Sequence, residues 1–185
     1  MPLKRIKDRR IIPISCDITN SAMLQSTIDS LDTPIDDFVN TIGTFLKKPV
    51  DSLSAEDIRQ HFELNSIANI TLTTLMLPKL RPSFSQILVC LATLALEARE
   101  QYSLQSATKA SYKFFLDSLR KEIFQHSRVM MIHPSSVQTN IFKKAGDKRE
   151  LSKYPSADVI AEMMQFMLSR PATIELRDMV VYNRS

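Results

Sequence analysis

Two cysteines and three histidines are the residues of this 185-residue chain that would mark a Cys/His zinc site, and the two cysteines could also form a disulfide bond. Cys16 and Cys90 lie 74 positions apart (90 − 16), and His61, His126 and His133 do not cluster with them. Zinc ligands and disulfide frameworks come in closely spaced sets. We therefore expect buried, unreactive thiols and no metal site.

Glycine, which lets a backbone approach a phosphate group closely, is rare in this sequence. The chain has two glycines, Gly43 and Gly146, where average usage of about 7% would give roughly 13. A dinucleotide pyrophosphate is held by backbone N–H groups in a turn that needs three glycines. The two present lie 103 positions apart (146 − 43), so they cannot form such a turn.

The overall composition, 44% hydrophobic and 24% charged, is typical of one soluble globular domain with a sizeable core. There is no apolar run of transmembrane length and no signal peptide, so a cytoplasmic location is the default expectation. Much of the net charge of +4 comes from residues 1–10. Because no aromatic side chains are interleaved with these charges, we expect a solvated arm and no nucleic-acid or membrane partner.

Short apolar runs alternate with segments of helical periodicity. The runs predict strands at residues 11–16, 35–39, 86–91, 129–132 and 178–182. Helices are predicted at residues 20–31, 54–78, 104–125 and 156–167, with Ser54 and Asp57 as a capping box. This alternation predicts βαβ units and a parallel sheet, in a single α/β domain that spans residues 1–185. A polar loop at residues 142–154 is either a mobile flap or a plain surface loop.

Five short motifs follow one another in a recognisable order. They are C-D-I-T at 16–19, I-D-D-F-V-N-T-I-G at 35–43, F-E-L-N at 62–65, S-A-T-K-A at 106–110 and H-P-S-S-V-Q-T at 133–139. In this order they resemble the D-V-T, D-x-x-V-N-N-A-G, F-x-x-N, Y-S-A-S-K-A and P-G-x-V-x-T motifs of the short-chain dehydrogenase/reductase family. Each motif alone is weak, but five in order make the resemblance strong.

The resemblance implies a doubly wound, Rossmann-like parallel sheet that lacks the family's first two strands and Gly-rich loop, and so an N-terminally truncated domain. In the family's strand order, 3-2-1-4-5-6-7, that loss leaves residues 11–16 without a neighbour and gives residues 35–39 an open edge. Residues 11–16 then pair with 35–39, which we expect for a compact fold. Otherwise the edge pairs with another chain, or the polypeptide folds poorly.

The resemblance also implies a site in which Asn, Ser, Tyr and Lys surround the nicotinamide of NAD(P). The family tyrosine exchanges a proton with the substrate, while the lysine lowers its pKa and contacts the ribose. Lys109 aligns with this lysine and Asn65 with the asparagine. Gln105 stands at the tyrosine position, and its amide has no proton to exchange near neutral pH. The serine position falls on Ala92, with Thr93 beside it.

Tyr102 and Tyr112 are the tyrosines nearest to Lys109 in sequence. Tyr102 lies seven positions before the lysine (109 − 102), and Tyr112 three positions after it (112 − 109). The family tyrosine stands one helical turn before the lysine. We therefore expect neither residue to replace it.

The residual cofactor positions that the resemblance implies are Asp17, Asn40, Gly43, Lys109 and Thr139. Each also has an ordinary interpretation. Asp17 and Thr139 fit helix or turn caps, Asn40 and Gly43 fit a turn at a strand end, and Lys109 fits an exposed helix lysine. Asn65 fits a backbone contact at a helix bend.

Three hypotheses remain open. The leading one is a short-chain dehydrogenase/reductase-like protein without autonomous NAD(P)-dependent oxidoreductase activity, which does not bind NAD(P) tightly. The second is a functional oxidoreductase whose cofactor-binding segment comes from a partner chain or from upstream sequence. The third is a homo-oligomeric interaction module, with a homodimer through the helices at 54–78 and 104–125. The sequence predicts neither the substrate nor a choice between NAD and NADP.

Overall fold

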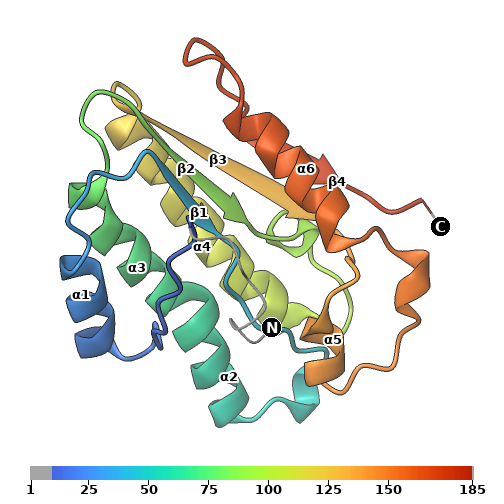
Figure 1. Ribbon diagram of the computed structural model, residues 1–185. Helices are drawn as coiled ribbons and strands as arrows, with labels where there is room; N and C mark the ends of the chain where they lie inside the picture. The colour runs from blue at the N-terminus through green and yellow to red at the C-terminus, as the bar shows by residue number, and fades with distance from the viewer. Residues whose placement is uncertain (1–9, 185) are drawn as a thin grey trace.

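One parallel sheet of four strands, in the order β1-β2-β3-β4, runs through the centre of the computed structural model, which describes residues 10–184 (Figure 1). The strands are β1 (Asp37–Asn40), β2 (Ser85–Cys90), β3 (Ser127–Pro134) and β4 (Asp178–Val181). All neighbouring pairs are parallel. Parallel neighbours need a crossover connection, which explains why helical segments separate the strands in sequence. The predicted fold class is confirmed.

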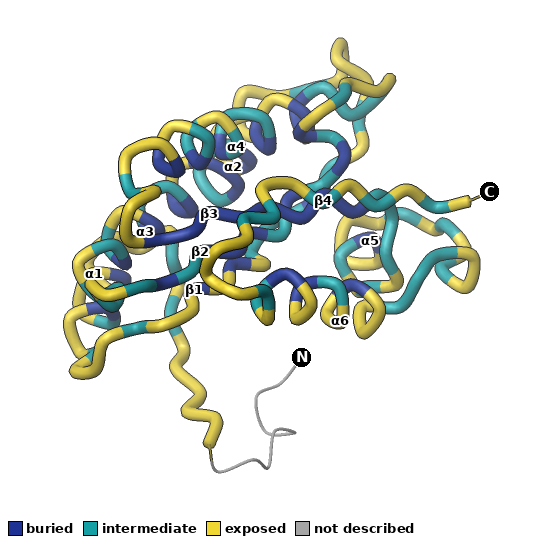
Figure 2. Tube along the Cα trace, turned by 90° about the horizontal axis from the view of Figure 1, so that it is seen from above, coloured by how far each residue is buried: buried dark blue, intermediate teal, exposed yellow. Residues whose placement is uncertain are grey.

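Helices cover both faces of the sheet, which gives three layers (Figures 1 and 2). One face carries α1 (Ser21–Asp29), α2 (Ala55–Phe62), α3 (Asn69–Met76) and α4 (Ser103–Ile123). The opposite face carries α6 (Ala157–Leu168), and the short α5 (Asn140–Lys144) lies beyond the carboxyl ends of the strands. The predicted loop at 142–154 therefore begins as the end of α5.

Two hydrophobic cores lie on the two faces of the sheet, as alternation along the strands requires. Val129 and Met131 of β3 belong to the core under α1, α3 and α4. Met130 and Ile132 belong to the core under α6, together with Met164 and Met167. The buried methionines of β3 and α6 thus fill parts of both cores. Burial of one such side chain stabilises the fold by about 1.5–3 kcal/mol.

Side-chain caps confirm the helix starts predicted at Ser54 and Ser156. The Ser54 hydroxyl accepts from the Asp57 backbone N–H, and the Asp57 carboxylate accepts from the Ser54 backbone N–H, which completes the capping box. Ser156 caps α6 in the same way by accepting from the Val159 backbone N–H. The helix predicted at 54–78 contains a π-helical turn at Glu63–Ala68, between α2 and α3. Such turns often occur at functional sites.

The prediction of a strand at residues 11–16, paired with the next strand, is wrong. This segment has no strand structure, and Ile11, Ile12 and Ile14 are 47%, 81% and 50% exposed. Figure 2 shows it leaving the body of the domain. Within residues 10–184, β1 pairs with β2 alone, and its Val39 is 42% exposed. An apolar run becomes a strand only where a partner supplies the ladder of hydrogen bonds, and no partner lies beside this one.

The described residues contain no cluster of side chains suited to a metal ion, and both cysteines are free and partly buried. No helix in this part of the chain is long and apolar enough to cross a bilayer. The basic arm lies almost entirely in residues 1–9, outside the described residues.

Candidate functional site

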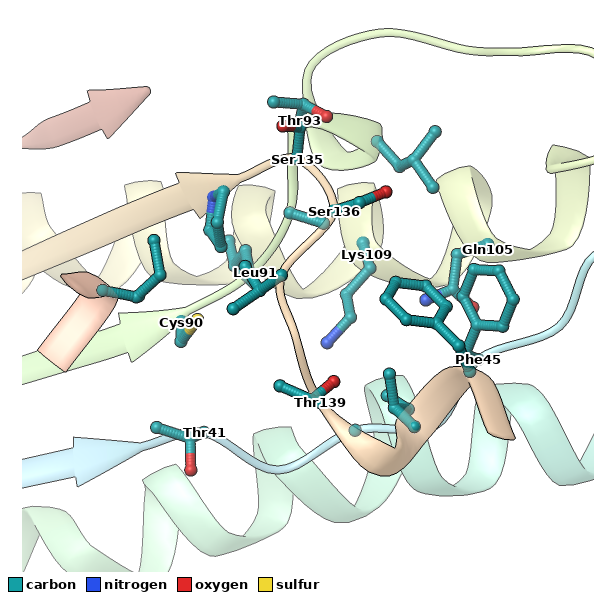
Figure 3. Close-up of a pocket in the computed structure, with 18 of the residues that line it drawn as sticks. Thr41, Phe45, Cys90, Leu91, Thr93, Gln105, Lys109, Ser135, Ser136 and Thr139 are labelled. Carbon is teal, nitrogen blue, oxygen red and sulfur yellow. The ribbon is translucent and has the colours of Figure 1, made fainter. Parts of the chain in front are cut away.

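A cavity of about 430 Å³ opens at the carboxyl ends of β1, β2 and β3. Its wall comes from the loops that follow these strands, from α4 and from the start of α6 (Figure 3). Ligands of doubly wound sheets bind outside the carboxyl ends of the strands, and this volume lies in the range of small-molecule sites. The cavity is therefore the candidate site.

Lys109 extends from α4 into this cavity (Figure 3). The residue is 5% exposed, and its Nζ makes no hydrogen bond or ion pair within residues 10–184. A Cβ atom placed on Gly43 would lie 2.8 Å from this Nζ, so only glycine leaves the amine its present position. Burial lowers the pKa of Lys109, and the neighbouring Cys90 opposes this only in part.

Gln105 lies one helical turn before Lys109, and both ends of its amide are engaged. Its Nε2 donates to the Thr44 carbonyl oxygen at 3.1 Å. Its Oε1 lies 3.0 Å from His61 Nε2, which donates when the imidazole carries its proton there. Burial lowers the pKa of His61, which favours the neutral ring. These contacts fix Gln105 in the cavity wall.

Asn65 lies in the π-helical turn and supports the loop after β1. Its Oδ1 accepts from the Thr44 backbone N–H at 2.8 Å, and its Nδ2 donates to the Thr44 carbonyl oxygen at 3.3 Å. Asn65 is fully buried and does not line the cavity. Its contacts in this structure are those of a residue that bonds backbone at a helix bend.

A family profile described as "short chain dehydrogenase" matches residues 2–150. The chain belongs to this family. Among curated proteins, a 3-amino-tetrahydro-pyrrolizinone reductase of Xenorhabdus hominickii is 30% identical over 118 residues, which are 61% of this chain and 40% of that protein. A ketoacyl reductase, HetN, of Nostoc is 28% identical over 118 residues, 62% of this chain and 41% of its own length. The chain thus spans about two-fifths of these relatives.

Solved structures of short-chain dehydrogenases share the fold. An alcohol dehydrogenase of Thermococcus sibiricus, complexed with 5-hydroxy-NADP, superposes with a TM-score of 0.81 at 16% identity, over 90% of this chain and 72% of that one. The serine dehydrogenase of Escherichia coli gives 0.78 at 20% identity, over 91% and 74%. At such identities the similarity shows the fold alone.

Within this short-chain dehydrogenase fold, several predicted site residues meet at the cavity. Lys109, Gln105, Gly43 and Thr139 line it, as do Ala92 and Thr93. Thr139 stands at the N-cap position of α5, but its side chain makes no cap hydrogen bond. The Thr139 hydroxyl therefore remains available to a ligand.

Two predicted cofactor positions lie apart from the cavity lining. The Asp17 carboxylate accepts from the Thr19 hydroxyl at 2.7 Å and from the Thr19 backbone N–H at 3.0 Å, contacts that lower the pKa of Asp17. Asn40 is buried, and its Nδ2 donates to Asn69 Oδ1 at 2.7 Å. The contacts of both residues are those of local turns and packing.

Neither tyrosine near Lys109 in sequence takes the place of Gln105. Tyr112 is buried on the far side of the cavity wall, where its hydroxyl lies 2.6 Å from Thr73 Oγ1, and burial raises its pKa to about 12. Tyr102 lies at the outer part of the cavity, and its hydroxyl accepts from Arg149 Nη2 at 3.0 Å.

A cluster of cation–π contacts between Arg149 and the rings of Phe45 and Phe142 was not predicted from the sequence. The Arg149 guanidinium lies 4.0 Å from the Phe142 ring centroid and 5.2 Å from that of Phe45. It also donates to Ser136 Oγ at 2.9 Å and to the Asp147 carboxylate at 2.6 Å. The contacts with Phe45 and Ser136 fasten the loop after α5 to the segments that follow β1 and β3, and no local spacing encodes them.

A complete nicotinamide dinucleotide does not fit the residues of this chain by themselves. The free Lys109 amine and Thr139 hydroxyl suit the polar groups of a small ligand. For a pyrophosphate, however, the space beside Gly43 is already occupied by the Lys109 amine. Gly146 lies in the loop after α5, where a Cβ atom placed on it would have no atom within 4 Å. No helix N-terminus carries the three glycines that close approach of a pyrophosphate needs.

Proposed function

We propose that this chain is a short-chain dehydrogenase-like protein without autonomous NAD(P)-dependent oxidoreductase activity. The proposal rests on Gln105, which stands where the family has its proton-exchanging tyrosine. Its amide is bonded at both ends, to His61 and to Thr44, so it has neither a titratable proton nor freedom to turn. Loss of such a group costs about 10²–10⁴ in rate.

Two further features support this proposal. Ala92 provides no hydroxyl where the family has a serine to bond the substrate oxygen. The 185 residues contain too few glycines for a phosphate-binding turn, so a tightly bound cofactor would need residues from elsewhere.

Isothermal titration calorimetry with NADPH and NADH tests the proposal directly. We expect no micromolar binding and no oxidation of NADPH in the presence of small aldehydes or ketones. Lys109→Met, which removes the amine that would contact a ribose, should give the same titration. Micromolar affinity with turnover would overturn the proposal, and micromolar affinity without turnover would overturn its statement about the cofactor.

A functional oxidoreductase is the second candidate. The open edge of β1 and the free polar groups of the cavity favour it, since both suit a cofactor-binding segment from a partner chain or from upstream sequence. Translation of the DNA upstream of Met1 tests this: a T-G-x-x-x-G-x-G motif encoded there would support it. Gln105 would still require another proton donor.

A homo-oligomeric interaction module is the third candidate. Exposed apolar side chains on the helices at 54–78 and 104–125 favour it, because Ile58, Ile67 and Phe114 are 42%, 53% and 68% exposed. A homodimer would bury them. Light scattering that gives a strict monomer would remove this candidate.

A further inference from the structure

We propose that Lys109 is a carbonyl-capturing amine, which forms an imine with an apolar aldehyde bound in the cavity. The inference goes beyond the proposed function, because it concerns covalent binding rather than hydride transfer. It requires that Lys109 is not covered by a nicotinamide cofactor.

The first observation is that the Lys109 amine has no partner. It makes no hydrogen bond or ion pair within residues 10–184, and no Asp or Glu side chain is among the described residues that line the cavity. A buried ammonium without a carboxylate is costly, so the protein favours the neutral amine. Neutral lysine in an apolar pocket is the form that adds to carbonyl groups.

Burial, rather than a neighbouring charge, lowers the pKa of Lys109. His61 of α2 lies behind Gln105 and is coupled to the lysine, and Arg99 and Arg149 line the outer cavity. Each arginine is paired with a carboxylate, Arg99 with Glu97 and Arg149 with Asp147, so neither adds an uncompensated charge beside the lysine. Cys90 is the one neighbour whose ionised form would favour the ammonium, and burial raises the pKa of that thiol, which keeps it neutral.

Lys113 provides an internal comparison, because it lies one turn further along the same helix. Its Nζ is 2.6 Å from an Asp117 carboxylate oxygen, and its side chain is 16% exposed. An ion-paired ammonium is not a nucleophile. Lys109 and Lys113, one turn apart on α4, therefore differ in the chemistry open to their amines.

The shape and lining of the cavity indicate the ligand class. Its wall around Lys109 is mostly apolar and includes Leu91, Leu94, Val137, Ile160 and Met164. Thr139 lines the same space, and its hydroxyl makes no hydrogen bond within residues 10–184 (Figure 3). An aldehyde with an apolar or aromatic body matches this arrangement, since a threonine hydroxyl can donate to its oxygen.

The covalent step balances without an oxidant or reductant. The Nζ lone pair forms a bond to the carbonyl carbon, and the C=O π electrons move to oxygen. The oxygen takes up the proton that nitrogen releases, which gives a carbinolamine. A second proton transfer then allows the C–O bond to break, so that water leaves and the C=N bond forms. The net reaction is amine plus aldehyde to imine plus water.

Reductive trapping tests the inference on the whole chain. The folded protein is incubated near neutral pH with 2-naphthaldehyde and sodium cyanoborohydride, and intact mass and peptide mapping locate the adduct. We expect one naphthylmethyl group, on Lys109. The adduct should be lost in Lys109→Arg, because guanidinium remains protonated, and retained in the matched control Lys113→Arg.

A second variant keeps the test decisive if Lys109→Arg does not fold. In Gly43→Ala the new methyl group would lie 2.8 Å from Nζ and would displace the amine from its position, so trapping at Lys109 should slow. Adducts on exposed lysines such as Lys153, with Lys109 unmodified, would overturn the inference, as would unchanged trapping in Gly43→Ala. Protection of Lys109 by NADPH would instead contradict the proposed function and leave the amine chemistry standing.

Discussion

Replacement of Tyr112 by phenylalanine should change how the stability of this fold depends on pH. Tyr112 is 1% exposed, and its hydroxyl lies 2.6 Å from Thr73 Oγ1 and 3.2 Å from Asn40 Nδ2. Burial raises the pKa of Tyr112 to about 12, although these hydrogen bonds act in the opposite direction. In the unfolded chain the same phenol titrates near pH 10.

The direction of the effect follows from which state holds the proton. Below about pH 10 the phenol is protonated in both states, so its stabilisation is fully present. Between about pH 10 and the pKa of the folded state, the unfolded chain releases the proton and the folded chain keeps it, which favours unfolding. Two pKa units correspond to about 3 kcal/mol lost over this interval.

The variant differs from the wild type in both pH ranges. Near neutral pH, Tyr112→Phe loses two hydrogen bonds and should be less stable by about 1–2 kcal/mol. Its stability should then fall less steeply above about pH 10, so that the two curves approach or cross near pH 12. Urea unfolding followed by circular dichroism at a series of pH values measures both effects. Parallel curves at all pH values would refute the reasoning.

Three further predictions concern stability and are checked by urea unfolding near neutral pH. Arg128→Met should lower stability by about 3–5 kcal/mol, because the buried guanidinium donates to the carbonyl oxygens of Ile174 and Arg170, which accept from no other donor among residues 10–184; an effect below about 1 kcal/mol would contradict this. Ser54→Ala should cost about 1 kcal/mol through the loss of the capping box, and an unchanged midpoint would show that the cap is dispensable. Lys109→Met should raise stability by about 1–3 kcal/mol, because it removes an unpaired buried amine, whereas a loss would indicate a hidden partner.

The elements of this fold were predictable where the signal is local. Ser54 and Ser156 mark helix starts through side chains that satisfy their own first turns. The run at 129–132 predicts a strand, and β3 forms there and is buried along its whole length. Residues 11–16 have the same apolar character, but whether such a run forms a strand depends on a neighbour that the local sequence does not specify.

The candidate site was predictable in its positions and less so in its contacts. The order of the motifs predicted that Lys109, Gln105 and Thr139 belong to one site, and all three line the cavity. The hydrogen bonds of Gln105 could not be predicted, because its partners lie far from it in sequence. His61 stands 44 positions before Gln105, and Thr44 stands 61 positions before it. Asn65 was expected to bond backbone at a bend, but the π-helical turn that holds it has no evident sequence signature.

The contacts of Arg149 have a consequence for the speed at which any small molecule enters and leaves. For the loop after α5 to move off the cavity, the guanidinium must separate from the Phe45 ring and from the Ser136 and Tyr102 hydroxyls. Arrival and departure then share one slow step, so a guest of modest affinity would still have a long residence time. Because none of these three contacts is an ion pair, added salt should change both the entry and the exit rate of an uncharged guest only a little.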